Sequence, residues 1–236
     1  MQNAMDFDLT PYFQKYEALL AAADAAFERV KTAHSTCVAC GIKCADCCHA
    51  LFDLTLIEAL YISHCFNQRL EADKRADVLE RANRADRQIH RLKRRAYREL
   101  KAGRSEEDIL TQFALERVRC PLLNEQDLCE LYDCRPATCR FYGIPTAIRG
   151  TGHTCGLSGF ETGKPYPTVN LDAVHAQLQQ LSAELLRDIK SNYVKLADLL
   201  VPLSMALLTD FDEYYLGIKE PEEEPHPPRV ERGKHR

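Results

Sequence analysis

The sequence lacks a long apolar run. Its longest apolar stretch, residues 199–208, is interrupted by Pro202 and Ser204 and is far shorter than the roughly 20 residues that a helix needs to span a bilayer. Asp6 and Asp8 stand near the amino terminus, where a signal peptide would have a basic region followed by an apolar run. We therefore expect neither a membrane segment nor a signal peptide.

The sequence also lacks the short motifs of several large enzyme classes. It has no GxGxxG, GxxxxGK[ST], HExxH or GxSxG, so motif evidence is absent for dinucleotide binding, phosphate loops, zinc peptidases and nucleophile elbows. The formal net charge is only −4, which gives the chain as a whole little attraction for nucleic acid or acidic lipid. The composition is that of an ordinary globular protein.

Cysteine is the residue that the sequence has in excess. Eleven cysteines are present, and an odd number cannot all pair in intramolecular disulfides. Most of them lie in two groups, which suits metal chelation better than long-range cross-linking. Because reduced thiols are typical of the cytosol, we predict a cytoplasmic protein.

Apolar residues recur at three- and four-residue steps over several segments, which predicts amphipathic helices. Thr55 and Glu58 have the spacing of a capping box at a helix start, and Ser105 with Asp108 has the same role further on. Gly103 is placed to end the helix before it. The expected helices cover residues 11–32, about 55–70, 72–101, a short segment after Ser105, about 174–189, and roughly 194–215 with a kink at Pro202.

The predicted helix over residues 72–101 has two stripes. One stripe is basic: residues 69–101, which include this helix, contain twelve Lys or Arg and six Asp or Glu. Such a stripe suits an acidic protein or nucleic acid, and the alternative is a solvated face with intrahelical pairs such as Asp77 with Arg81. The apolar stripe consists of Val78, Ala82, Ala85, Ile89, Leu92, Ala96 and Leu100.

Residues 1–218 are predicted to form one domain, because a chain of 236 residues can bury one sizeable core without needing two. Residues 120–167 are rich in Gly and Pro and have no apolar period, so they should be mostly loop. Residues 219–236 contain four prolines and almost no apolar residue, which predicts a disordered tail. The expected fold class is mainly α, with helices that support an irregular, cysteine-rich, metal-binding lobe.

The first cysteine group, at residues 37–48, is dense enough to surround a metal. Thiolates separated by two or three residues can wrap a zinc ion or an iron–sulfur cluster. Adjacent residues usually direct their side chains apart, so Cys47 with Cys48 favours two metals, or one cluster with a spare thiol. The five candidate ligands are Cys37, Cys40, Cys44, Cys47 and Cys48.

The second group, at residues 120–155, lies within the predicted loop. A loop of this length in a compact protein needs an organising constraint, and metal ligation by Cys120, Cys129, Cys139 and Cys155 would supply one. Cys65 lies on a predicted helix far from either group, so we interpret it as an ordinary buried cysteine. The two groups are expected to converge on one lobe.

The second group also carries a family resemblance. The run CPLL from Cys120 and the pattern CxLYxxRPxxCR from Cys129, together with a first group that ends in two adjacent cysteines, resemble the YkgJ-like cysteine-cluster proteins. That family is described as zinc- or iron-chelating and is named for a CxxCxxCC motif. The resemblance covers about residues 37–156. It implies eight ligands, at Cys40, Cys44, Cys47, Cys48, Cys120, Cys129, Cys139 and Cys155.

Two features depart from the family pattern. Three residues separate Cys40 from Cys44 where the motif has two, so Cys37 is expected to replace or supplement one ligand. Cys134 occupies a position where no ligand is expected, and its role is open.

Several residues beside the cysteines are candidates for supporting roles. Arg135 and Arg140 either donate hydrogen bonds to a cofactor's sulfur atoms, which would raise its reduction potential, or anchor the loop through carbonyls. His49 and His153 lie next to cysteines and are reserve zinc ligands, although such histidines more often serve a turn.

Three functions follow from these features. We favour a redox or metal-handling role with iron, as an iron–sulfur cluster, over zinc, because the cysteines are dense and no histidine is regularly interleaved. The second is a zinc-stabilised module that binds nucleic acid or protein through residues 72–101. The third, which rests on resemblance alone, is a cluster-dependent modifying enzyme similar to flagellin lysine methylases.

Overall fold

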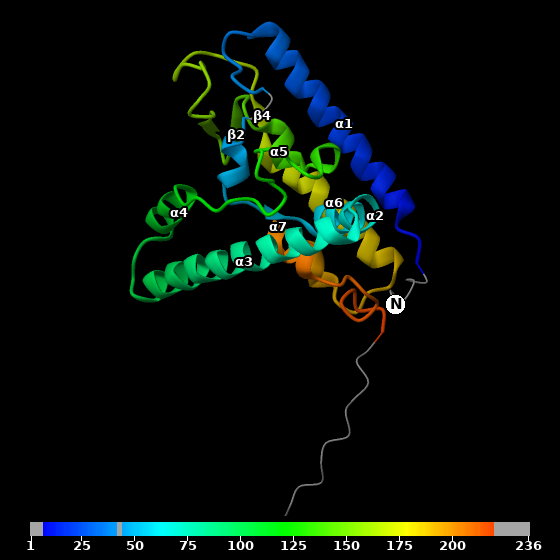
Figure 1. Ribbon diagram of the computed structural model, residues 1–236. Helices are drawn as coiled ribbons and strands as arrows, with labels where there is room; N and C mark the ends of the chain where they lie inside the picture. The colour runs from blue at the N-terminus through cyan, green and yellow to red at the C-terminus, as the bar shows by residue number, and fades with distance from the viewer. Residues whose placement is uncertain (1–6, 42–43, 220–236) are drawn as a thin grey trace, which may run out of the picture.

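The structure, a computed structural model, describes residues 7–41 and 44–219. It is mainly helical, as the sequence predicts (Figure 1). The predicted tail lies outside the described residues except for Lys219. The helices of the described part are α1 (Thr10–Ala33), α2 (Leu56–Arg69), α3 (Ala72–Lys101), α4 (Glu106–Ala114), α5 (Ala137–Phe141), α6 (Leu171–Asp188) and α7 (Leu203–Leu208), with 3-10 helices η1 (Asp46–His49), η2 (Tyr132–Cys134) and η3 (Val194–Asp198).

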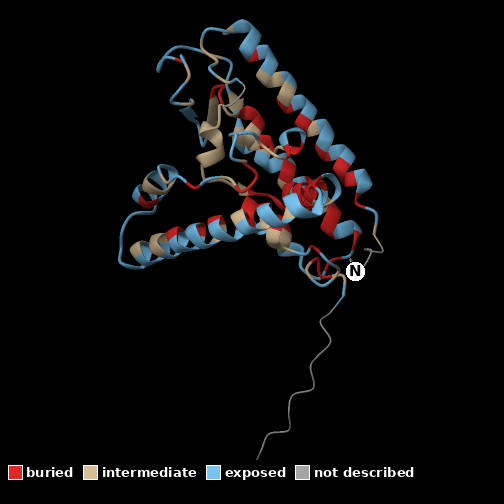
Figure 2. Ribbon diagram, in the orientation of Figure 1, coloured by how far each residue is buried: buried red, intermediate tan, exposed pale blue. Residues whose placement is uncertain are grey.

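Helix α2 lies at the centre of the main core and is buried over most of its length (Figure 2). Thr55 begins it through the predicted capping box: its N–H donates to Oε2 of Glu58 at 3.1 Å. The ring of Tyr61 packs edge-on against Phe13 and Tyr16 of α1, with centroids 5.4 and 5.1 Å apart. Because α6 and α7 also pack on α2, one core joins the first and last helices of the described chain.

Helices α3 and α4 form an arm that extends from this core (Figures 1 and 2). The predicted apolar stripe of α3 is buried as far as Leu92. Beyond that point the stripe leaves the core: Ala96 is only half-buried, and Leu100 is 46% exposed. Gly103, at φ 90°, follows the end of α3 as predicted, and the Oγ atom of Ser105 accepts the Asp108 N–H at 3.0 Å to cap α4.

The basic side chains of α3 have mixed partners. Arg84 pairs with Glu80 on the same helix at 2.8 Å. Arg81 does not pair with Asp77 as expected: its Nε atom donates to the carbonyl oxygen of Pro121 at 2.8 Å. That contact attaches α3 to the residue after Cys120. Binding of an acidic partner or nucleic acid by this helix remains a prediction.

The single long helix predicted over residues 194–215 is wrong. The chain forms η3, then strand β5 (Val201–Pro202), then the short helix α7. Proline lacks a backbone N–H and disfavours helical geometry in the residue before it, so the break is complete where only a kink was expected. Strand β5 pairs antiparallel with β1 (Asp53–Leu54), which follows the first cysteine group.

Residues 120–167 are mostly loop, as predicted, but they also contain a hairpin that the sequence did not predict. Strands β2 (Thr146–Ile148) and β3 (Thr151–His153) pair antiparallel, and β4 (Val169–Asn170) adds to β2 in parallel. The two turn residues, Arg149 and Gly150, both have positive φ, as a two-residue hairpin turn of the primed type requires. No helix in the described part of the chain is long and apolar enough to cross a membrane.

Candidate metal centre

The backbone brings the two cysteine groups together. The N–H of Cys120 donates to the carbonyl of Cys48 at 2.7 Å, and the N–H of Val118 donates to the carbonyl of His49 at 3.0 Å. An antiparallel bridge between Ala50 and Arg117 continues this pairing. The predicted convergence of the two groups is therefore confirmed, and η1 lies directly against the start of the second group.

Thiols from both groups line one cavity of about 430 Å³. Its other walls are largely apolar and include Ala85 and Ile89 of α3, Leu51 and Leu203. We call five of the thiols the inner thiols, because they act on one another electrostatically around this cavity. They are Cys47, Cys48, Cys120, Cys129 and Cys139.

Burial and neighbouring sulfur atoms raise the pKa of four inner thiols, which are Cys47, Cys120, Cys129 and Cys139. Burial, together with the nearby sulfur of Cys129, raises the pKa of Cys120 to about 12. Burial also raises the pKa of Cys139 well above its usual range, and Cys120 and Cys47 add to that effect. Thiols gathered in this way repel one another once ionised, so a bound cation is needed to stabilise them together as thiolates.

The two adjacent cysteines do not point apart. A hydrogen bond between the thiols of Cys47 and Cys48 is the main cause of the raised pKa of Cys47. Both side chains line the cavity. The expectation of diverging side chains is therefore wrong for this pair, which lies in the 3-10 helix η1.

Three more thiols form a neighbouring set, which we call the outer thiols. Cys40, Cys44 and Cys155 interact electrostatically, and burial together with these neighbours raises the pKa of Cys40 to about 11. Cys44 also lines the cavity, and Cys47 influences the pKa of Cys40, so the inner and outer thiols are contiguous. Cys37 is tied to the segment after Cys155, because its carbonyl accepts the Gly159 N–H at 2.8 Å.

Gly143 leaves room for the thiol of Cys40. At φ +99°, a Cβ atom there would lie 2.1 Å from the Cys40 Sγ atom. That sulfur donates to the carbonyl of Tyr142 at 3.6 Å. A side chain at position 143 would therefore displace a predicted ligand.

Replacement of Gly143 by alanine is expected to lower both stability and bound metal. Gly103→Ala is the matched control, because Gly103 has φ +90° and no atom within 4 Å of its Cβ position. Both variants should lose about 1 kcal/mol from the strained backbone, but only Gly143→Ala should lose metal. Urea unfolding and metal analysis measure the two effects, and equal metal content in both variants would show that the Cys40 position does not matter.

The two predicted arginines differ in what they contact. Arg135 lines the cavity, lies over the ring of Tyr132 with 3.6 Å from Cζ to the centroid, and lowers the pKa of Cys139 and Cys129. Arg140 is buried and donates to the carbonyls of Arg135 and Asp133 and to the carboxylate of Asp24. Arg135 therefore faces the thiols, whereas Arg140 anchors the loop.

The two histidines differ in their surroundings, because only the His49 ring contacts a backbone carbonyl. Nδ1 of His49 lies 3.0 Å from the carbonyl oxygen of Ala45 within the turn that carries Cys47. His153 lies on the exposed strand β3, in register with Thr146.

Glu58, a buried carboxyl that was predicted only as a helix cap, positions the second group. Its Oε1 atom accepts the Ala137 N–H at 3.2 Å, at the start of the helix that carries Cys139. Its Oε2 atom accepts the Thr55 N–H and hydroxyl at 3.1 and 3.0 Å. The capping-box spacing revealed half of this role, but the link to α5 has no local signal in the sequence.

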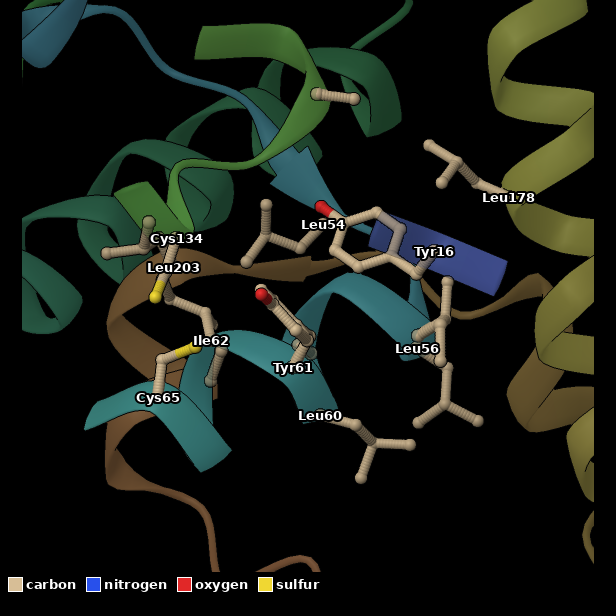
Figure 3. Close-up of a cluster of buried hydrophobic side chains, with 14 of the residues drawn as sticks. Tyr16, Leu54, Leu56, Leu60, Tyr61, Ile62, Cys65, Cys134, Leu178 and Leu203 are labelled. Atoms are coloured by element: carbon tan, nitrogen blue, oxygen red, sulfur yellow. The ribbon is translucent and has the colours of Figure 1, made fainter. Parts of the chain in front are cut away.

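Cys65 is buried, as expected, but the prediction that it lies far from either cysteine group is wrong. It lies in α2 and is hydrogen-bonded to the thiol of Cys134, at the end of η2 (Figure 3). Neither residue lines the cavity. All eleven cysteines of the chain are free.

The donor set fits a thiolate-binding metal in its chemistry. No three or more His, Cys, Asp or Glu side chains within residues 7–41 and 44–219 are arranged around the position of one metal ion. An iron–sulfur cluster attaches its cysteines to separate irons, so its ligands need not surround a single point. Comparison with family models, curated proteins and solved structures gives no match to this chain.

Proposed function

We propose that the chain binds a thiolate-ligated metal centre, an iron–sulfur cluster, between its two cysteine groups. The observation that carries the proposal is the set of five inner thiols, from η1, the central loop and α5, around one cavity. The CPLL and CxLYxxRPxxCR segments, which resemble those of the YkgJ-like proteins, contain three of these thiols. Three things are proposed together: that the metal is iron in a cluster, that the chain is similar to the YkgJ-like proteins, and that its role is in redox chemistry or metal handling.

Ligands for the cluster would come from the inner thiols. Cys47 and Cys48 project from one short helix, whereas Cys120, Cys129 and Cys139 come from the facing segment. Such a cluster supplies one-electron redox chemistry when bound. The outer thiols would complete the ligand set or hold a second metal.

The surroundings suit a redox centre. Arg135 places a positive charge beside the inner thiols, which favours the thiolate form and tends to raise a cluster's reduction potential. Apolar side chains, among them Ile89 of α3 and Leu203 of α7, line much of the cavity, which limits solvent access and so adjusts the potential further. A reducing compartment such as the cytoplasm would keep the thiols available for the metal.

Metal and sulfide analysis of the full chain tests the choice of metal. The protein is purified without oxygen from cells that are supplied with iron and zinc. We expect iron with stoichiometric acid-labile sulfide and a broad visible absorption band. Colourless protein with zinc would replace the cluster by a structural zinc site, and protein with neither metal would refute the proposal.

A further inference from the structure

A second pair of thiols lies outside the cavity. Cys65 belongs to the last turns of α2 and Cys134 ends η2, and their side chains are 2% and 1% exposed. Figure 3 shows the two sulfur atoms turned toward each other from these elements. The pair lies outside the eight positions that the family resemblance assigns as ligands.

The two thiols are chemically unequal. The thiol of Cys134 donates a hydrogen bond to the sulfur of Cys65, which lowers the pKa of Cys65 and raises that of Cys134. Burial opposes the first effect, whereas the nearby guanidinium of Arg69 supports it. Tyr61 also lies beside Cys65, with its hydroxyl directed to Glu17 at 2.8 Å. Cys65 is thus the better nucleophile, and Cys134 is placed to react with it next.

The pair lies just beneath the surface. Arg69 and Asp133, which flank it from the two elements, are exposed, and both act electrostatically on the thiols. These exposed neighbours on both elements place the pair close to the surface, from which a small, uncharged oxidant can approach it. With only two sulfur donors, the site is poorly suited to a metal, which needs more ligands.

We propose that Cys65 and Cys134 form a redox-active dithiol that hydrogen peroxide converts to a disulfide. The Cys65 thiolate attacks one peroxide oxygen, the O–O bond breaks, and the products are a Cys65 sulfenic acid and water once the leaving hydroxide takes a proton. The Cys134 sulfur then attacks the Cys65 sulfur, the S–O bond breaks, and a second water leaves. Overall, two thiols lose two electrons to one peroxide, which gives one disulfide and two water molecules.

The disulfide would connect the core helix α2 to the segment that carries Arg135 and Cys139. When the two thiols are reduced, only packing and hydrogen bonds connect α2 to this segment. Oxidation would therefore tie the central helix covalently to one wall of the cavity. This modification site does not depend on the metal, so it stands or falls separately from the proposed metal centre.

Peptide mapping of the full chain tests the proposal. Protein purified without oxygen, with its metal content recorded, receives an equimolar amount of hydrogen peroxide, and the remaining thiols are then alkylated. Trypsin with a glutamate-specific protease releases residues 59–69, in which Cys65 is the sole cysteine, and residues 131–140. Fragment ions of the second peptide distinguish Cys134 from Cys139.

We expect the cross-link between these two peptides through Cys134 to be the main oxidised species, with or without bound metal, and to disappear with dithiothreitol. Cys134→Ala should abolish it and leave Cys65 as sulfenic acid, whereas Cys37→Ala should leave the cross-link unchanged. Recovery of Cys65 and Cys134 in alkylated form after the other thiols have oxidised would overturn the proposal. A bond from Cys65 to any other cysteine would overturn it as well.

Discussion

Replacement of Glu58 by alanine is expected to lower the free energy of unfolding by about 3 kcal/mol or more. The carboxylate accepts hydrogen bonds from two backbone groups, Thr55 N–H and Ala137 N–H, and from the Thr55 hydroxyl. The hydroxyl of Tyr16 lies 3.5 Å from its Oε1 atom. Because all of these groups are buried, removal of the carboxylate leaves several donors without an acceptor.

Two variants separate this role from ordinary helix capping. Glu58→Gln keeps one acceptor oxygen, but its amide NH₂ would face a backbone N–H, so it should cost about 1–3 kcal/mol. Ser105→Ala removes an exposed cap from α4 and should cost about 1 kcal/mol. Urea unfolding measures all three variants. If Glu58→Ala costs no more than Ser105→Ala, the buried network does not hold α5 in place.

The difference between wild type and Glu58→Gln should depend on pH. Burial, the largest influence, raises the pKa of Glu58 above its ordinary value, although hydrogen bonds from Thr55 and Ala137 oppose the shift. The folded protein therefore keeps this proton to higher pH than the unfolded chain does. The contribution of the group to stability is full below the ordinary carboxyl pKa, and it falls as pH rises toward the folded value. The advantage of wild type over Glu58→Gln should accordingly be larger near pH 4 than near pH 7, as urea unfolding at both pH values would show.

Most of the helices could be predicted from the sequence because their signals are local. The apolar spacing of residues 11–32 and the caps at Thr55 and Ser105 each act within one or two turns, and the structure contains all three features. The exposure of Leu100 could not be predicted in this way. Periodicity shows that a helix has an apolar face, but it does not show where the core beneath that face ends.

The failures in the second half of the chain came from partners that are distant in sequence. Pro202 was interpreted as a kink, but the strand that it ends pairs with residues 53–54. The hairpin at residues 146–153 turns at Arg149 and Gly150, which is not one of the strong Asn-Gly or Asp-Gly signals. Neither element has a local pattern strong enough to identify it.

In the candidate site, too, the features with a local signal were predicted and those that depend on distant contacts were not. Cysteine spacing predicted that the two groups meet, because ligands of one metal must converge. Spacing did not show that Cys65 lies beside Cys134, since that contact depends on how α2 packs against η2. It also did not separate Arg135, which faces the thiols, from Arg140, which anchors the loop.

Loss of a single inner thiol from either group is expected to remove most of the bound metal. Cys47 belongs to the first group and Cys139 to the second, and both line the same cavity. If one centre is held jointly, serine at either position should reduce metal per chain roughly tenfold or more, since even changes beyond the direct ligands cost 10–100-fold in affinity. Serine preserves the size of the side chain but lacks a readily ionised thiol.

Cys65→Ala is the matched control, because it removes a thiol that does not line the cavity. All variants are purified without oxygen, so that oxidation of the dithiol does not contribute, and circular dichroism verifies that each retains its helical content.

Metal content per chain in Cys47→Ser, Cys139→Ser and Cys65→Ala tests the shared centre most directly. If both cysteine groups hold one centre, the two serine variants both lose the metal and Cys65→Ala keeps it. Loss from Cys47→Ser with full retention in Cys139→Ser, or the reverse, would contradict a centre that is shared by the two cysteine groups.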